Sequence, residues 1–119
     1  MNIQIYGKSK CFDTKKAERW FKERRIKFQS VDLLRFGLSP KEYASVKSAV
    51  GGFRELIDTS SRAYEELYIA HLARDADVEA KLMEYPELMR TPIVRNGRRA
   101  TVGYRPEVWA EWEKEDKNG

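Results

Sequence analysis

With 119 residues, 41% of them hydrophobic and 35% charged, the chain has the size of one globular domain, and we expect a single domain over residues 1–119. No apolar run approaches the roughly 20 residues of a membrane-spanning helix, and the N-terminus lacks the apolar stretch of a secretory signal, so we expect a cytoplasmic protein without a membrane partner. The net charge of +4 is modest, and because no helix-turn-helix or zinc-finger spacing accompanies it, we expect no nucleic acid partner.

The N-terminal part of the chain predicts a strand, a helix and a second strand. Residues 2–6 alternate apolar and polar side chains, as a short strand does. Residues 13–25 place apolar side chains at helical spacing, with Asp13 or Thr14 available to cap the first turn. Residues 27–33 are again typical of a strand. A right-handed crossover between the two strands would make them parallel neighbours in one sheet.

The middle of the chain predicts helices. Residues 39–42 supply a serine cap, a proline at the first helical position and a glutamate three residues after the cap, and Gly51–Gly52 ends this helix. Shorter helices should follow, over residues 53–57, 64–72 and 76–85. These segments together form a helical insertion over about residues 39–86.

The C-terminal part predicts a hairpin and a helix. Residues 92–95 and 99–102 have strand character, and Asn96–Gly97 between them is a strong signal for a hairpin turn. We expect the arginines of this hairpin to be solvated. A last helix should begin near Pro106, which makes the whole order βαβ, helices, ββα.

Cys11 is the only cysteine, and it lies where the first strand turns into the first helix. No internal disulfide can form, and one histidine beside one cysteine gives no metal-ligand spacing, so we expect no metal site. A lone cysteine is usually a small buried hydrophobe. Here, however, free backbone N–H groups of the first helical turn would lower the pKa of the thiol. Lysines nearby act in the same direction: Lys8, Lys10, Lys15 and Lys16. We therefore predict a reactive thiolate.

The basic residues are unevenly distributed along the chain. Residues 8–27 contain nine basic and three acidic residues, and residues 90–105 contain five arginines and no acid. Lysines and arginines spread over helices usually form only a solvated face. A basic rim would nevertheless suit a ligand with several carboxylates, such as glutathione.

Four segments, spread in order over almost the whole chain, carry recognisable motifs. They are CFDTKKA at residues 11–17, LIDT with YEEL at residues 56–59 and 64–67, TPIV at residues 91–94, and VGYRP at residues 102–106. Together they resemble the motifs of the arsenate reductase, Spx and MgsR family. The resemblance implies an α/β, thioredoxin-like fold with a mixed sheet in the order βαβ…ββα and a helical insertion. It also implies that Pro92 is a cis-proline beside the thiol.

Arsenate reductases of this family attack arsenate with the thiolate and hold the oxyanion with three arginines, so the resemblance also implies site residues. Only Arg105 matches an arginine position by position, because Thr91 and Asp58 stand where the other two are expected. Arg90 precedes Thr91, but adjacent strand residues point to opposite faces. An acid in place of a cation repels an oxyanion substrate, so we expect weak or no arsenate reduction.

Thr14 occupies the place of the second cysteine in a Cys-X-X-Cys pair. Its hydroxyl can hydrogen-bond a thiolate but cannot resolve a disulfide, so the resolving thiol must come from outside. The first hypothesis is therefore a monothiol oxidoreductase that forms a mixed disulfide with glutathione or is coupled to a glutaredoxin. Its candidate catalytic residues are Cys11, Thr14 and Arg105, and its candidate glutathione contacts are Lys10, Thr91 and Pro92.

An alternative hypothesis comes from the same resemblance. Spx-like transcriptional regulators bind the C-terminal domain of the RNA polymerase α subunit instead of catalysing a reaction. Their redox switch needs a pair of cysteines, and Thr14 removes one of them. A regulator without the switch would still bind the polymerase.

Overall fold

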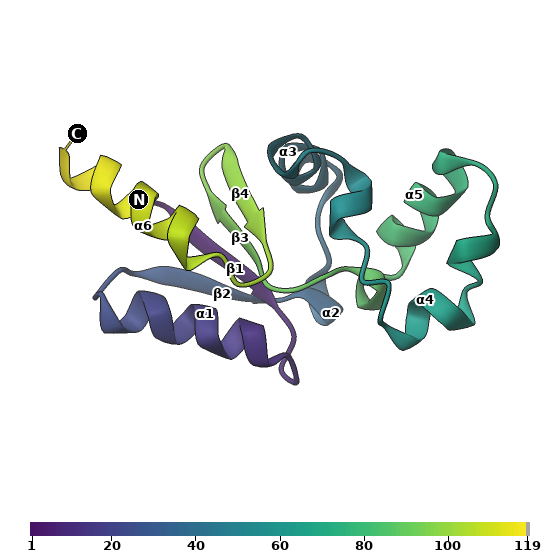
Figure 1. Cartoon of the computed structure of the whole chain (residues 1–119), viewed down its shortest axis with the longest axis horizontal. Coiled ribbons are helices and arrows are strands. Elements are labelled where there is room, and N and C mark those ends of the chain that lie inside the picture. Colours follow the sequence, from purple (N-terminus) through teal and green to yellow (C-terminus); the bar gives the residue numbers. More distant parts are fainter. Residues whose placement is uncertain (119) are drawn as a thin grey trace.

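The computed structural model describes the backbone of residues 1–118, a four-stranded mixed sheet with helices around it (Figure 1). The sheet order is β2-β1-β3-β4, with the bounds β1 (Ile3–Gly7), β2 (Phe28–Asp32), β3 (Ile93–Asn96) and β4 (Arg99–Val102). β1 and β2 are parallel, whereas β3 is antiparallel to both β1 and β4. The arrangement confirms the α/β, thioredoxin-like order that the sequence predicts.

α1 (Phe12–Glu23) connects the two parallel strands. Its buried apolar side chains recur at the helical period, as predicted: Ala17, Trp20 and Phe21. The predicted cap by Asp13 or Thr14 is wrong. Cys11 is the N-cap residue, and the helix begins directly after it.

Seven short helices lie between β2 and β3 in the described chain, and they extend from Leu33 to Leu88. They are α2 (Leu33–Phe36), α3 (Pro40–Val50), α4 (Arg62–Glu66), α5 (Asp75–Glu84) and the 3-10 helices η1 (Phe53–Leu56), η2 (Ile69–His71) and η3 (Pro86–Leu88). The predicted capping box at the start of α3 is present, and Gly51 ends that helix with a φ of 94°. No helix within residues 1–118 is long and apolar enough to cross a membrane.

The helix predicted over residues 64–72 is broken in the structure. α4 ends at Glu66, and Tyr68 adopts a left-handed conformation with a φ of 55° before η2 begins. A single left-handed residue reverses the direction of the backbone, so a continuous helix is impossible there. α2 was not predicted, although Asp32 caps it by accepting a hydrogen bond from the backbone N–H of Leu34 at 3.1 Å.

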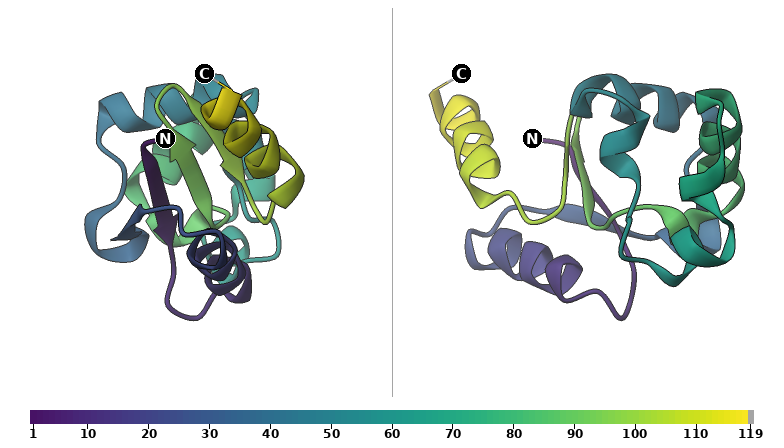
Figure 2. Two further views of the ribbon diagram at one scale, coloured as in Figure 1. Left: turned by 90° about the vertical axis from the view of Figure 1, so that its left-hand side faces the viewer. Right: turned by 45° about the vertical axis from the view of Figure 1, so that its right-hand side comes forward.

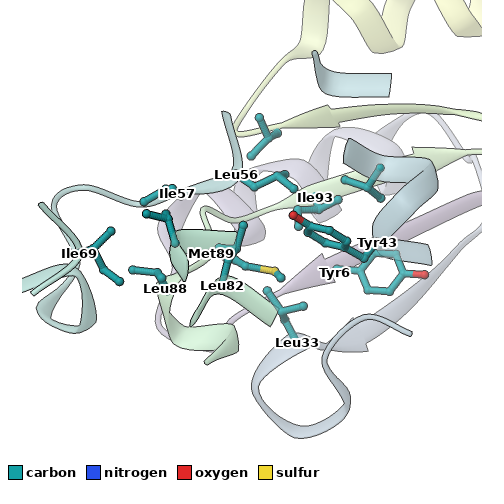
Figure 3. Close-up of a cluster of buried hydrophobic side chains, with 13 residues drawn as sticks. Tyr6, Leu33, Tyr43, Leu56, Ile57, Ile69, Leu82, Leu88, Met89 and Ile93 are labelled. Atoms are coloured by element: carbon teal, nitrogen blue, oxygen red, sulfur yellow. The ribbon is translucent and has the colours of Figure 1, made fainter. Parts of the chain in front are cut away.

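Two separate hydrophobic clusters lie on the two faces of the sheet. Alternation along β1 and β3 directs Ile5 and Val94 to the first cluster, where α1 and α6 (Pro106–Asn118) cover the sheet. Tyr6 and Ile93 point the other way, into a second cluster that they share with the helices between β2 and β3 (Figure 3). In Figure 1, α1 and α6 accordingly lie on the left and the helical insertion on the right.

The predicted hairpin of β3 and β4 is present, but its turn is shifted by one residue. Asn96 pairs with Arg99, so Gly97 and Arg98 form the turn, and Gly97 has a φ of 62°. The expectation of solvated arginines is wrong for Arg95, whose side chain is only 17% exposed. Strand alternation puts Arg95 on the same face as Ile93, where the helical insertion covers the sheet.

Arg95 belongs to a polar cluster between the sheet and α3. Its guanidinium donates to Gln4 at 3.1 Å and to the Tyr6 hydroxyl at 3.3 Å. It also lies 3.8 Å from the carboxylate of Glu42, which accepts a hydrogen bond from Tyr6 at 2.6 Å. Glu42 is the capping-box residue of α3, so this cluster connects the start of that helix to β1 and β3.

Candidate functional site

Cys11 lies at the end of a tight turn between β1 and α1. Its backbone N–H donates to the carbonyl of Lys8 at 3.0 Å, which closes the turn. Its half-buried thiol donates to the carbonyl oxygen of Thr91 across 3.6 Å. The loop that precedes β3 therefore lies beside the sulfur at Thr91, next to the proline for which the family resemblance implied such a position.

Hydrogen bonds hold the pKa of the Cys11 thiol below its ordinary value. Burial acts most strongly and raises this pKa, because the thiolate loses solvent. Hydrogen bonds from the side chains of Thr14 and Thr91 and from the backbone N–H groups of Thr14 and Asp13 together outweigh burial. The helix terminus therefore acts on the thiol as the sequence predicted, with two threonine hydroxyls in addition.

Thr14 is oriented by the backbone of the thiol turn. Its hydroxyl oxygen accepts the N–H of Lys8 at 3.4 Å, which leaves the hydroxyl hydrogen available to the sulfur. A Cβ on Gly7 would lie only 2.2 Å from Cγ2 of Thr14. Gly7 is thus the residue that allows Thr14 to sit against the strand end, a role that sequence reasoning missed because Gly7 looked only like a strand terminator.

Pro92 follows Thr91 through a cis peptide bond, as the resemblance implied. Pro92 is buried, and its carbonyl accepts the N–H of Gly103 at 2.8 Å. This bond joins the start of β3 to the loop between β4 and α6. Lys10, in contrast, is exposed in the thiol turn.

Lys8 connects the thiol turn to the segment before Thr91. Its ammonium donates to the carbonyls of Glu87 at 3.1 Å and Met89 at 2.7 Å. Burial lowers the pKa of Lys8, and the charges of Asp58, Cys11 and Glu87 only partly offset this effect. Sequence reasoning counted Lys8 among several nearby lysines, because nothing in the local pattern indicates which of them is half-buried.

Two of the three expected arginine positions lie near the thiol turn, with Thr91 beside the sulfur and Asp58 near Lys8. Asp58 lies close enough to the Lys8 ammonium to raise its pKa, so an acid does stand near the thiol turn. Arg105 is exposed, and its Nε lies 2.6 Å from Oε1 of Glu107. Within residues 1–118, Glu107 is thus the ion-pair partner of Arg105.

Arg90 does not belong to a strand, so the alternation argument against it does not apply. Its backbone N–H donates to the carbonyl of Leu56 at 2.8 Å, and its guanidinium donates to the carbonyl of Glu55 at 3.2 Å. One guanidinium nitrogen lies 3.3 Å from the position that a Cβ on Gly103 would take. Arg90 therefore connects η1 to the loop after β4.

A cleft of about 290 Å³ adjoins the thiol turn on the side of β2. Its walls are the ends of β1 and β2, the thiol turn and the first turns of α1, with Lys8, Thr14 and Lys15 among the lining residues. Thr91 and Pro92 do not line it. Within residues 1–118, no group of three or more His, Cys, Asp or Glu side chains is placed to hold a metal ion.

Known proteins resemble this chain over nearly its whole length. The model of the ArsC family matches residues 6–112. The global transcriptional regulator Spx 2 of Oceanobacillus iheyensis is 32% identical, with 94% of this chain and 93% of that protein covered. The regulatory protein MgsR of Bacillus subtilis is 26% identical, with 87% of this chain and 84% of that protein covered.

Solved structures share the same fold. A putative ArsC family related protein from Bacteroides fragilis superposes with a TM-score of 0.83 at 22% identity, covering 93% of this chain and 97% of its own. An arsenate reductase from Vibrio cholerae does so with a TM-score of 0.81 at 24% identity and the same coverage. Because the family model spans the thiol turn, the Thr91–Pro92 loop and most of α6, the chain belongs to the ArsC family.

Proposed function

We propose that this protein is a monothiol oxidoreductase that exchanges disulfides through Cys11. One observation supports the proposal above others: hydrogen bonds from Thr14, Thr91 and the first turn of α1 converge on one half-exposed sulfur and lower its pKa. The thiolate, which a lower pKa favours, is the form that attacks a disulfide.

In the proposed reaction, the Cys11 thiolate attacks one sulfur of oxidised glutathione. A new bond forms between the sulfur of Cys11 and that of one glutathione, the original S–S bond breaks, and the second glutathione leaves as a thiolate. Thr14 offers a hydroxyl where a second cysteine would resolve the adduct. A thiol from glutathione or a glutaredoxin must therefore release Cys11 in a second exchange.

The proposed glutathione contacts are Lys10, Thr91 and Pro92. A molecule that is disulfide-bonded to Cys11 would lie against the Thr91 carbonyl, 3.6 Å from the sulfur, and the buried Pro92 behind it. Lys10 is exposed one residue before the cysteine, so its ammonium is available to a carboxylate of the tripeptide. Thr14 would stabilise the Cys11 thiolate as the leaving group in the second exchange.

We further propose that arsenate reduction is weak or absent. Of the nearby cations, Lys8 is already bonded to two backbone carbonyls, and Arg105 is paired with Glu107. Asp58 adds a negative charge close to Lys8. An incoming oxyanion would have to displace these interactions before it gained charge-assisted bonds of its own.

The test is the mass of the protein after it has been mixed with oxidised glutathione. The expected result is one added glutathione, removed again by glutaredoxin with reduced glutathione, and no addition in a Cys11→Ser control. Arsenate turnover is measured in parallel with the same reductants. An unmodified wild-type protein would refute the monothiol exchange, and robust arsenate turnover that depends on Cys11 would refute the second proposal.

A second candidate function is transcriptional regulation, which the names of the relatives favour. Spx 2 of Oceanobacillus iheyensis is called a global transcriptional regulator, and MgsR of Bacillus subtilis a regulatory protein. Binding to the C-terminal domain of the RNA polymerase α subunit would not need Cys11. Stoichiometric capture of that domain by both the wild type and Cys11→Ser would support this function, and absence of capture would exclude it.

A further inference from the structure

The outer face of α1 is a continuous basic surface that starts beside the thiol. Figure 1 and Figure 2 show α1 on the outside of the molecule, with no element on the side that faces away from the sheet. Positions three and four apart on a helix lie next to one another. Four exposed cations follow this rule along the helix, namely Lys15, Lys16, Arg19 and Lys22.

None of these four cations has an ion-pair partner within residues 1–118. Other exposed cations of the described chain are unpaired as well, Lys41 and Lys114 among them, but these four share one face of a single helix. Of the three acids of α1, Asp13 is half-buried in the first turn, Glu18 is half-buried and bonded to Ser30, and Glu23 is exposed at the last position. The charge of this face is therefore left for a partner.

An exposed aromatic residue lies between this surface and the sulfur. Phe12 directly follows Cys11. It is 80% exposed, more than any other large hydrophobic residue in the described chain. Lys16 lies one turn further along and its ammonium is 5.4 Å from the ring of Tyr104, which is 36% exposed. An apolar contact and a basic stripe thus begin at the same thiol.

We propose that the surface formed by Phe12, Lys15, Lys16, Arg19 and Lys22 docks an acidic protein segment that presents its own sulfur to Cys11. The inference rests on the proposed disulfide exchange and names the class of partner: a protein whose reactive cysteine is flanked by acidic and apolar residues. Opposite charges along the two surfaces would raise the rate of encounter and fix the orientation. Phe12 would contact the apolar residue next to the partner's cysteine.

An acidic protein explains these features better than a nucleic acid does. The basic stripe ends at a thiolate, whose reaction requires a sulfur that nucleic acids lack. The exchange follows the same steps as the exchange with oxidised glutathione. The Cys11 thiolate bonds to the partner's sulfur, the partner's disulfide bond breaks, and the displaced sulfur leaves as a thiolate.

Docking is tested first without any thiol chemistry. A fluorescent peptide that carries glutamates on one side of a serine and a leucine on the other is titrated with the full-length protein, and its anisotropy is measured. The comparison peptide has glutamine in place of each glutamate. We expect the acidic peptide to bind at least about tenfold more tightly at low salt. Salt should reduce the difference, since exposed charges are screened beyond about 10 Å at 0.1 M ionic strength.

The decisive variant neutralises the face: Lys15→Gln/Lys16→Gln/Arg19→Gln. Its matched control, Lys41→Gln/Arg98→Gln/Lys114→Gln, removes the same net charge from exposed positions elsewhere. We expect the first variant to lose the preference for the acidic peptide and the control to keep it. Equal effects of the two variants, or no preference in the wild type, would overturn the docking surface.

The coupling to Cys11 is tested with peptides that carry cysteine as a mixed disulfide with thionitrobenzoate. The acidic peptide should release thionitrobenzoate about tenfold faster than the glutamine peptide, and Phe12→Ala should slow both peptides without slowing a small hydroxyethyl disulfide reagent. Failure of the small reagent to react would refute the exchange, whereas anisotropy decides the docking independently. Suppression of peptide binding by a DNA oligonucleotide that binds more tightly would assign the face to nucleic acid and overturn the proposal.

Discussion

Replacing Thr14 by valine should make Cys11 a weaker acid with little change in shape. Valine keeps the methyl group that faces Gly7 and loses the hydroxyl that hydrogen-bonds the sulfur. Because hydrogen bonds to charged groups contribute about 1.5–3 kcal/mol, and because water reaches the half-exposed sulfur, we take the lower end. About 1.5 kcal/mol corresponds to roughly a tenfold fall in the ratio of thiolate to thiol at any given pH.

The assay is the rate of iodoacetamide alkylation of Cys11 as a function of pH. Loss of a bond that favours the thiolate raises the pKa, so the midpoint of the Thr14→Val profile should move to higher pH. Thr14→Ser is the matched control, because it keeps the hydroxyl and should keep the wild-type midpoint. A Thr14→Val profile that coincides with that of the wild type would refute the role of the hydroxyl.

Valine also removes the acceptor of the Lys8 N–H, a long bond of 3.4 Å. We expect this loss to lower the free energy of unfolding by about 1 kcal/mol. Urea denaturation separates this effect from the change in pKa, because alkylation is measured well below the unfolding midpoint. A variant that is unfolded in the absence of urea would show unrestrained alkylation, and the serine control would reveal it.

The other predictions concern the surroundings of the thiol and the polar cluster under α3. A Cβ at position 7 would lie 2.2 Å from Thr14, so Gly7→Ala should lower the free energy of unfolding by about 1–3 kcal/mol in urea denaturation, and by less in a Thr14→Ser background. Lys8→Met removes the donor to two carbonyls and a positive charge near Cys11, so the alkylation midpoint should rise, more than in a Lys10→Met control at an exposed position. Burial raises the pKa of Glu42, but hydrogen bonds from Tyr6 and Ser39 and the charge of Arg95 hold it below the ordinary 4.5. Its contribution to stability is therefore present above 4.5 and is lost as the pH falls through the folded-state pKa, so Glu42→Gln should flatten the acid side of the urea midpoint against pH.

Local signals predicted most of the elements of this fold. The capping box of α3 and the glycine that ends it depend on neighbours within four residues, and both are present. The hairpin of β3 and β4 was likewise predicted, with its turn shifted by one residue to Gly97–Arg98. The left-handed Tyr68 was missed, because such a conformation is not a preference of tyrosine and no glycine or asparagine marks the position.

The position of Cys11 before a helix was determined by the sequence itself, and with it the direction of its pKa shift. The partners that complete the site were not, since Thr91 and Met89 lie 80 and 81 residues away from Cys11 and Lys8, respectively. Likewise, Arg95 is covered because α3 begins above its face of the sheet, where Glu42 lies 3.8 Å from its guanidinium. Sequence spacing encodes neighbours along one element, whereas contacts between elements depend on how both hydrophobic faces of the sheet are covered, and only the tertiary structure decides that.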